Sequence, residues 1–305
     1  MGPITGWAAM AAMDTATAMI ISKTRMIMTI TIMTTGMITA MTIAMRILTG
    51  ILIPIPMLTQ SGSRMTTDLD PRSPANLTPG GLMRLMTWLS PSFPVGAYTY
   101  SHGVEYAVED RRVISAESLT TWIEGVLEFG AGRIDAVLFC AAWRAARAGD
   151  MDALFDIGVD ADCWRGTAEM ALEATAQGRA FVSTAQKVWG DGILTDWAKR
   201  MRDDDRLPSY PVAVGIAAAE ADVPLRDALS AFLHAMAANL VSSAVRLVPL
   251  GQTDGVRTLA SLDKAVAMAT ETAMNTDPVN LGAAALMVDW TSMKHETQYT
   301  RLFRS

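Results

Sequence analysis

The sequence predicts an all-α protein built as a single-domain helical bundle. Apolar residues recur at the spacing of one helix face in nearly every long segment between residues 80 and 290. No segment in that range alternates convincingly at the period of a β-strand. Half of the residues are hydrophobic, so the chain can bury the core that such a bundle requires. No repeat of about 20–50 residues is present, which argues against a solenoid.

The expected helices follow one another with short breaks. Ser90-Pro91 stops the first, Ser115 is a suitable N-cap for the second, and Pro224 stands where the first turn of a helix tolerates proline. In chain order, we expect helices over residues 82–89, 115–127, 134–148, 166–189, 224–248, 258–274 and 281–290.

Residues 1–64 differ in composition from the rest, since Met, Thr, Ile and Ala dominate them. A secretory signal would begin with a basic region, and the best membrane-span candidate, 37–57, contains Arg46 and two prolines. In the reading frame that starts one base earlier, with codons typical of a GC-rich genome, the Met-rich run would encode mostly His and Asp. We therefore expect 1–64 to be an out-of-frame or disordered extension, with the genuine start at Met65 and a disordered, proline-rich leader over 65–79.

Charge and cysteine content narrow the classes of partner. The chain has 25 basic and 31 acidic residues, and removing the four basic and one acidic residue of segment 1–64 leaves a net charge of −9. Because no basic run suggests a phosphate backbone, no nucleic acid is expected as a partner, and no membrane either. Cys140 and Cys163 stand far apart, which gives no disulfide framework and suits a reducing cytoplasm. The classes of binding partner that remain are proteins and small ligands.

A search for chemistry yields no catalytic, cofactor-binding or metal-binding residue. The three histidines, His102, His234 and His295, belong to no pattern with metal-ligand spacing. His234 is interpreted as a satisfied histidine at a tight contact between helices. No P-loop and no GxGxxG motif is present, and the run Asp203-Asp204-Asp205 is flanked by arginines, as at a solvated helix end. We expect no enzyme activity and no cofactor.

Three stretches are unusual for a plain bundle. Residues 90–105 combine two prolines, two glycines and three aromatic residues, which makes either a stiff interaction surface or an internal brace. Residues 246–255 break a long helix, and Arg246 either contacts a partner or complements the helix dipole. His102 has two readings as well, an exposed partner contact or a hydrogen bond in a turn.

The last stretch, 295–305, belongs to a polar and partly basic tail over 291–305. Tyr299, Leu302 and Phe303 fall at i, i+3 and i+4, so a short helix would gather them on one side. Such a tail would dock either on its own bundle or on a partner, and we favour the partner.

These stretches resemble signatures of the UreF family of urease accessory proteins. The first resembles SPxFPVGxYxYSxGxE, the second RLxPLGQTDG and the third HETQYxRLFRS, while 210–215 (YPVAVG) fits a further family segment. The resemblance spans about 77–305 and implies a UreF-like fold over 80–290.

The resemblance implies a non-enzymatic scaffold for nickel insertion into urease. Such a protein would act in the cytoplasm, dimerise, bind UreD (called UreH in some organisms), recruit and regulate the GTPase UreG, and dock on the apo-urease subunits. The expected partner-binding residues are Pro91, Pro94, Gly96, Tyr98, Tyr100, Ser101, His102, Glu105, Arg246, Gln252, His295, Tyr299, Arg301, Leu302, Phe303 and Arg304. The alternatives are a helical enzyme with a cryptic site and a helical protein anchored to a membrane through 37–57.

Overall fold

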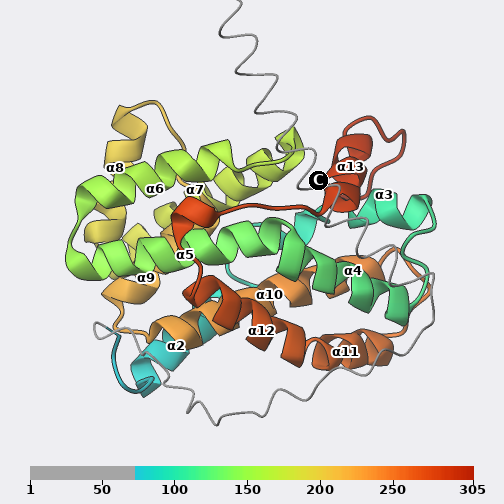
Figure 1. The fold of residues 1–305 in the computed structure, drawn as a ribbon, viewed down its shortest axis with the longest axis horizontal. Helices are drawn as coiled ribbons and strands as arrows, with labels where there is room; N and C mark the ends of the chain where they lie inside the picture. Colours follow the sequence, from blue (N-terminus) through green and yellow to red (C-terminus); the bar gives the residue numbers. More distant parts are fainter. Residues whose placement is uncertain (1–72) are drawn as a thin grey trace, which may run out of the picture. The chain divides into compact units, whose positions relative to one another are not determined.

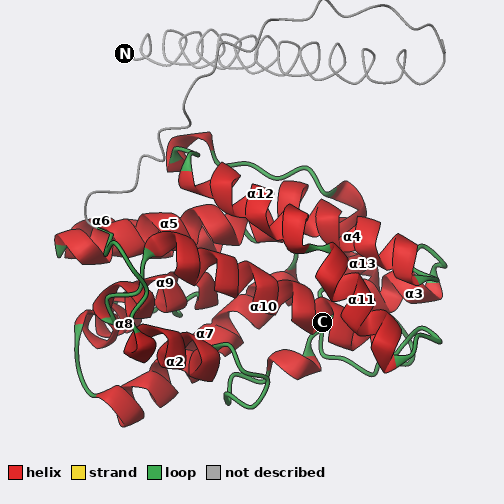
Figure 2. Ribbon diagram, turned by 90° about the horizontal axis from the view of Figure 1, so that it is seen from below, coloured by secondary structure: helices red, strands yellow, loops and turns green. Residues whose placement is uncertain are grey.

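The computed structural model describes residues 73–305, and the expectations for segment 1–64 and for positions 65–72 of the leader lie outside the described residues. Figure 2 shows helices joined by loops throughout the described part, where no strand is present. The all-α prediction is therefore confirmed. In chain order the elements are α2 (Pro79–Trp88), the 3-10 turn η1 (Ala97–Thr99), α3 (Val104–Glu109), α4 (Ala116–Phe129), α5 (Ala131–Ala148), α6 (Met151–Cys163), α7 (Ala168–Trp189), α8 (Ile193–Asp203), α9 (Tyr210–Glu220), α10 (Leu225–Val245), α11 (Gln252–Ser261), α12 (Asp263–Met274), η2 (Pro278–Asn280) and α13 (Leu286–His295).

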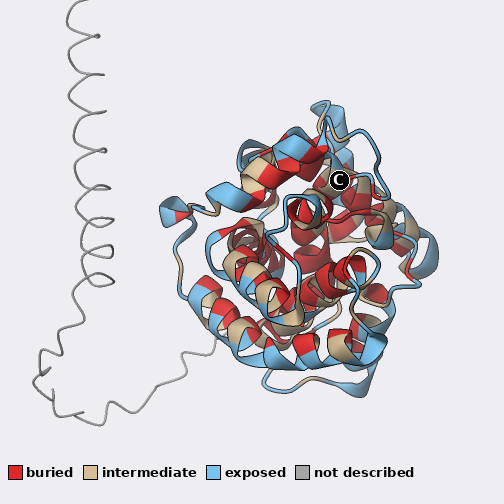
Figure 3. Cartoon of the chain, turned by 90° about the vertical axis from the view of Figure 1, so that its right-hand side faces the viewer, coloured by how far each residue is buried: buried red, intermediate tan, exposed pale blue. Residues whose placement is uncertain are grey.

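The centre of the bundle is the pair α5 and α9, which pack along each other (Figure 1). Small residues allow this close approach: a side chain at Gly215 of α9 would lie 2.8 Å from the carbonyl oxygen of Phe139 on α5. Every residue of α9 from Pro211 to Ala219 is buried. Figure 3 shows the buried residues gathered in the interior of the helical bundle and the exposed ones on its outside.

Local signals explain several helix ends. Ser115 caps α4, where its hydroxyl accepts from the Ser118 backbone N–H at 3.3 Å. The hydroxyl of Thr78 caps α2 in the same way at 3.0 Å. Gly149 ends α5 in the left-handed conformation, with φ of 68°, which a glycine adopts without a steric penalty. These caps fix where the helices begin and stop.

Other helix boundaries differ from the predicted ones. The expected helix 258–274 is two helices, α11 and α12, which meet at the fully buried Leu262; neither proline nor glycine marks this break in the sequence. The helices α6, α8 and α9 were not predicted. In α9 the reason is physical, because a helix buried on all sides carries no amphipathic pattern.

The helix α10 is long and apolar enough to cross a membrane, and no other described helix passes that test. Half of its most apolar stretch is buried inside the bundle. Burial against neighbouring helices therefore accounts for its composition as a core helix.

Candidate functional site

The three unusual stretches lie side by side in the structure. The guanidinium of Arg246, just after α10, donates to the carbonyl oxygen of Tyr98 in the first stretch at 2.9 Å. The same guanidinium lies 4.3 Å from the ring centre of Phe303 in the last stretch. The backbone N–H of Arg304 donates to the carbonyl of Thr99 at 2.8 Å, and Figure 1 shows the chain end beside α3 and α13. Arg246 thus joins all three stretches.

The backbone of the first stretch is shaped by left-handed residues. His102 and Gly103 have φ of 55° and 78°, and this conformation is uncommon for a residue other than glycine. A side chain at Gly103 would meet the backbone N–H of Ser292 and the hydroxyl of Thr291, both at 2.9 Å. The glycine therefore lets α3 rest directly on α13.

A buried histidine lies between two carboxylates below this contact. His295, at the end of α13, is fully buried; its Nδ1 is 2.8 Å from Glu169 Oε2 on α7, and its Nε2 is 2.9 Å from Glu105 Oε2 on α3. Glu105 also accepts from the backbone N–H groups of Leu302 at 2.6 Å and Phe303 at 2.9 Å. We call Glu105, Glu169 and His295 the carboxylate clamp. The clamp ties the C-terminal stretch to two helices.

The electrostatics of the clamp are unusual for a buried site. Burial raises the pKa of Glu169, and the hydrogen bond from His295 and the nearby charge of Arg301 partly oppose that rise. Arg301 approaches Glu169 at 3.2 Å from the exposed side. A buried carboxylate is costly unless it is paired, so the hydrogen bond from His295 and the charge of Arg301 offset part of that cost.

A second set of polar contacts involves His102 and Glu173, one helical turn after Glu169 on α7. His102 Nδ1 is 3.3 Å from Glu173 Oε2, which also accepts from the Ser305 hydroxyl at 3.1 Å. The Ser101 backbone N–H and hydroxyl both donate to the main-chain oxygen of Ser305 at 2.5 Å. Burial lowers the pKa of His102, but its hydrogen bond to Glu173 and nearby carboxylates outweigh burial and leave that pKa raised. The end of the described chain is therefore held by charge and hydrogen bonding.

The predicted partner-binding residues divide by exposure. The buried ones are Tyr100, Ser101, Glu105, His295 and Phe303, and the half-buried ones are Gly96 and His102. The exposed ones are Pro91, Pro94, Tyr98, Arg246, Gln252, Tyr299, Arg301, Leu302 and Arg304. Among the described contacts, no hydrogen bond or ring contact joins Pro91, Pro94 or Gln252 to the clamp.

Two interpretations of the sequence are wrong. No helix forms after α13, so Tyr299, Leu302 and Phe303 do not share a face: Tyr299 is fully exposed, Leu302 is 63% exposed and Phe303 is 4% exposed. The stretch is extended because its backbone N–H groups bond to Glu105 and Thr99 instead of to its own carbonyls. His234 is exposed on α10 and does not lie at a tight helix contact.

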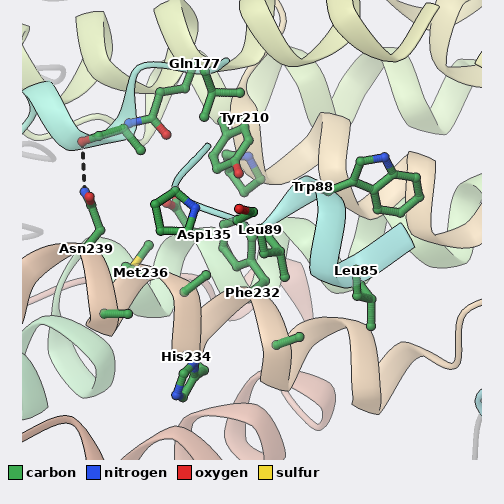
Figure 4. Close-up of a pocket in the computed structure, with 18 of the residues that line it drawn as sticks. Leu85, Trp88, Leu89, Asp135, Gln177, Tyr210, Phe232, His234, Met236 and Asn239 are labelled. Atoms are coloured by element: carbon green, nitrogen blue, oxygen red, sulfur yellow. Dashed lines mark hydrogen bonds between the residues drawn. The ribbon is translucent and has the colours of Figure 1, made fainter. Parts of the chain in front are cut away.

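A cavity of about 740 Å³ opens between α2 and α10 (Figure 4). Its walls are mostly apolar, with Leu85, Phe232 and Met236 among them, and its polar groups include Asp135, Gln177 and Tyr210. Asp135 pairs with Arg165 at 2.6 Å. Since this carboxylate is neutralised by its own ion pair, it is poorly placed to act as a general base. Within residues 73–305, no group of three or more His, Cys, Asp or Glu side chains is arranged to hold a metal ion.

Comparison with known proteins assigns the chain to a family. The family model described as UreF matches residues 113–263. A protein of Granulibacter bethesdensis named urease accessory protein UreF is 49% identical over 224 residues, which cover 73% of this chain and 94% of that protein. The chain belongs to the UreF family. Proteins of the same name from Rhodopseudomonas palustris (48% identical over 225 residues; 73% of this chain, 93% of the relative) and Magnetococcus marinus (45% over 233 residues; 75% and 99%) are also similar to it.

Membership of the UreF family settles the class of protein. These relatives are named accessory proteins, and this UreF-family chain is an accessory protein rather than an enzyme. The alternative of a helical enzyme with a cryptic site is therefore not supported.

The sequence analysis does not single out the acidic residues on α7. Glu169, which belongs to the clamp, and Glu173 fall within the expected helix 166–189, yet they contact His295 and His102, respectively. Their spacing of four residues puts both on one face of α7. Two acidic residues on one face, with histidines elsewhere in the chain, were the available signal.

Proposed function

We propose that this UreF-family protein is a non-enzymatic scaffold for the insertion of nickel into apo-urease. It binds UreD/UreH, recruits and regulates the GTPase UreG, and docks on the apo-urease subunits, as a homodimer in the cytoplasm. One observation carries the proposal beyond family membership: the three stretches that carry the UreF signatures meet on one side of the bundle, joined by Arg246.

The surface around this meeting point has the character of a docking site for UreD. Tyr98 is 61% exposed and Leu302 is 63% exposed, and Tyr299, in the same stretch as Leu302, is fully exposed. Burying an apolar side chain of this size against a partner stabilises a complex by roughly 1.5–3 kcal/mol. Arg301 and Arg304 add positive charge in a domain that is otherwise acidic, which favours an acidic partner surface.

Substitution tests the UreD interface better than truncation does. Removing residues 295–305 would delete His295 and leave two buried carboxylates unpaired, so the bundle itself would suffer. Leu302→Glu changes only an exposed side chain and should abolish co-purification of tagged UreD with the full chain. Val188→Glu on α7, which is 62% exposed, is the matched control and should leave co-purification intact. Undiminished recovery of UreD by the Leu302 variant would contradict the proposed interface.

We propose further that nickel is not held tightly by this protein alone. The histidines His102 and His295 are each engaged with glutamates, and Cys140 is buried. Burial also raises the pKa of Cys140 to about 12, which disfavours the thiolate that binds a metal. Calorimetric titration should give nickel binding no tighter than about micromolar; tight stoichiometric binding within one protomer would contradict this.

Residues 1–64 are proposed to be dispensable for this role. The match to a UreF protein of Rhodopseudomonas palustris covers 242 residues, which are 79% of this chain and 100% of that relative. A chain that starts at Met65 should recover UreD and UreG as well as the full chain does. Loss of either partner on that truncation would show that the segment contributes.

A further inference from the structure

The cavity between α2 and α10 is large enough to hold a small molecule. Its volume of about 740 Å³ falls within the range of about 300–1,000 Å³ that is typical of ligand pockets. Trp88 on α2 and Phe232 and Met236 on α10 form apolar parts of its wall. The cavity opens beside Met86, which is 62% exposed. An apolar molecule therefore has both a way in and a surface to cover.

Three polar side chains from three other helices line the same cavity and keep hydrogen-bonding capacity (Figure 4). The hydroxyl of Tyr210 on α9 makes no hydrogen bond among the described residues. Gln177 on α7 donates from its Nε2 to Glu173 at 3.1 Å, which leaves its carbonyl oxygen free to accept. Asp135 on α5 gives one carboxylate oxygen to Arg165 at 2.6 Å and keeps the other. One donor and two acceptors are thus available in the cavity.

Two ring nitrogens add to this excess of unpaired polar atoms. Nε2 of His102 and Nε1 of Trp88 are buried and have no hydrogen-bond partner within residues 73–305. Both side chains line the cavity. Buried polar atoms of folded proteins are nearly always hydrogen-bonded, so a concentration of exceptions around one cavity indicates a ligand that would engage some of them.

The charges beside the cavity cancel in pairs. Asp135 pairs with Arg165 at 2.6 Å, and Glu173 pairs with His102 at 3.3 Å. A charged head group would therefore meet no unpaired opposite charge, and burying an unpaired charge is costly. The cavity favours an uncharged ligand.

The unpaired groups also define the head group of that ligand. Burial raises the pKa of Tyr210, so its hydroxyl stays protonated and can donate. Gln177 and Asp135 offer oxygens that only accept. A hydroxyl or a primary carboxamide accepts and donates at once, and therefore matches both.

We propose that this cavity binds one uncharged amphiphile per protomer, with its apolar tail between α2 and α10 and its hydroxyl or carboxamide head held by Tyr210, Gln177 and Asp135. The bound tail bridges α2 and α10. The site is separate from the carboxylate clamp and does not depend on the proposed function.

Calorimetric titration of the full chain with 1-octanol tests the site. Octanol should bind saturably, with one molecule per protomer and a dissociation constant of about 0.1–1 mM. Octanoate has the same chain length and a charged head, so it should bind at least about tenfold more weakly. Equal binding of the two probes, or a titration that does not saturate, would overturn the proposal.

A conservative variant tests the head group. Tyr210→Phe keeps the ring, which packs on Phe181 and Phe232, and removes a hydroxyl that has no partner in the unliganded chain. Its denaturation midpoint should therefore not fall, while its affinity for octanol should fall about 3–10-fold. Tyr299→Phe, at a fully exposed tyrosine that does not line the cavity, is the matched control and should change neither. Unchanged octanol affinity in Tyr210→Phe would overturn the assignment of the head group.

A blocking variant tests the location. Ala235 on α10 lines the cavity, and Ala235→Phe should fill part of it and abolish octanol binding with the helical circular dichroism unchanged. Undiminished binding would place octanol elsewhere and overturn the proposal. If this variant does not fold, the comparison with octanoate and the Tyr210→Phe variant decide the matter.

A second copy of the chain is the competing occupant of the cavity. Sedimentation velocity should show the same oligomeric state with and without octanol. Octanol binding that requires dissociation of an oligomer would show that another copy fills the cavity, and would overturn the proposal. Because none of these experiments involves UreD or nickel, their failure leaves the proposed scaffold function in place.

Discussion

The α5–α9 core and the carboxylate clamp stabilise the same bundle by opposite means. The core is apolar and close-packed, with Val212, Ile216 and Phe139 fully buried against small residues. The clamp is equally buried but is made of glutamates and a histidine that pair with one another. Burial of apolar area stabilises in every ionisation state, whereas a buried ion pair stabilises only while both partners keep their charge. The contribution of the core to stability therefore does not depend on ionisation, whereas the contribution of the clamp is conditional on the charges of its residues.

This difference has a consequence for function. Segments that must rearrange to bind a partner are drawn from the least stable parts of a fold. The C-terminal stretch is held mainly by hydrogen bonds and an ion pair to carboxylates, so we expect it to open more readily than α5 and α9, which are held by apolar packing. The conditional region is also the one that carries the three UreF signatures.

A substitution that disrupts the core should have the largest effect on the free energy of unfolding. Trp143 is fully buried on α5, and its indole N–H donates to the Val223 carbonyl at 3.1 Å. Trp143→Ala should lower the free energy of unfolding by about 4 kcal/mol, because it creates a cavity and leaves that carbonyl without its donor. Chemical denaturation followed by circular dichroism measures the loss. A decrease below about 1 kcal/mol would contradict the description of a tightly packed core.

Separating α3 from α13 should have the next largest effect. Gly103→Ala places a methyl group 2.9 Å from the Ser292 backbone, at a residue with φ of 78°. The steric conflict and the left-handed backbone together should cost about 2–4 kcal/mol, and the loss should be concentrated at α3, α13 and the C-terminal stretch. Hydrogen exchange resolved by segment checks this. Equal loss in α9 would show that the two regions are not separable.

Removing the bridge between the three stretches should have a smaller effect. Arg246→Met keeps part of the side chain over Phe303 and removes the charge and the hydrogen bond to Tyr98. The expected loss is about 1–2 kcal/mol, again confined to the C-terminal side. Arg257→Met is the control, because Arg257 is exposed on α11 and pairs only with Asp254 in the described contacts. A similar loss of free energy of unfolding in both variants would show that Arg246 does not bridge the three stretches.

The pH dependence should be the smallest of these effects and should have a definite sign. The pKa values of His102 and Glu169 are both raised in the folded protein. Groups with raised folded pKa values bind protons more tightly when folded, so their contribution is present below the unfolded pKa and is lost as the pH rises. The ordinary pKa values of these groups are 4.5 for Glu169 and 6.5 for His102. The free energy of unfolding should therefore fall as the pH rises past each value.

The upper part of this decline belongs to His102. His102→Asn preserves a residue that tolerates the left-handed backbone and should flatten the decline above pH of about 6.5. Thermal melts across this range would measure it. An increase of stability over the same range, or an unchanged slope in the variant, would contradict the assignment.

Much of the fold could be predicted from the sequence, and much of the site could not. Helix caps such as Ser115 depend on contacts between residues close in sequence, so they can be recognised in a single sequence. The break at Leu262 is set by burial among distant residues and leaves no local mark. The three unusual stretches were recognisable, but their convergence depends on the packing of α3, α7 and α13. His295 pairs with Glu105 and Glu169, which are 190 and 126 positions away. This pairing depends on the tertiary structure and leaves no pattern in the sequence.

Native-state hydrogen exchange of the unsubstituted full chain tests the division between core and clamp most directly. The amides inside α5 and α9 should exchange only through global unfolding, with a strong dependence on denaturant. The amides of Ser101, Leu302 and Phe303 should exchange through a separate opening of lower free energy and weaker denaturant dependence. If all of these amides shared one opening free energy and one denaturant dependence, the bundle would open as a single unit and the clamp would not be a conditional element.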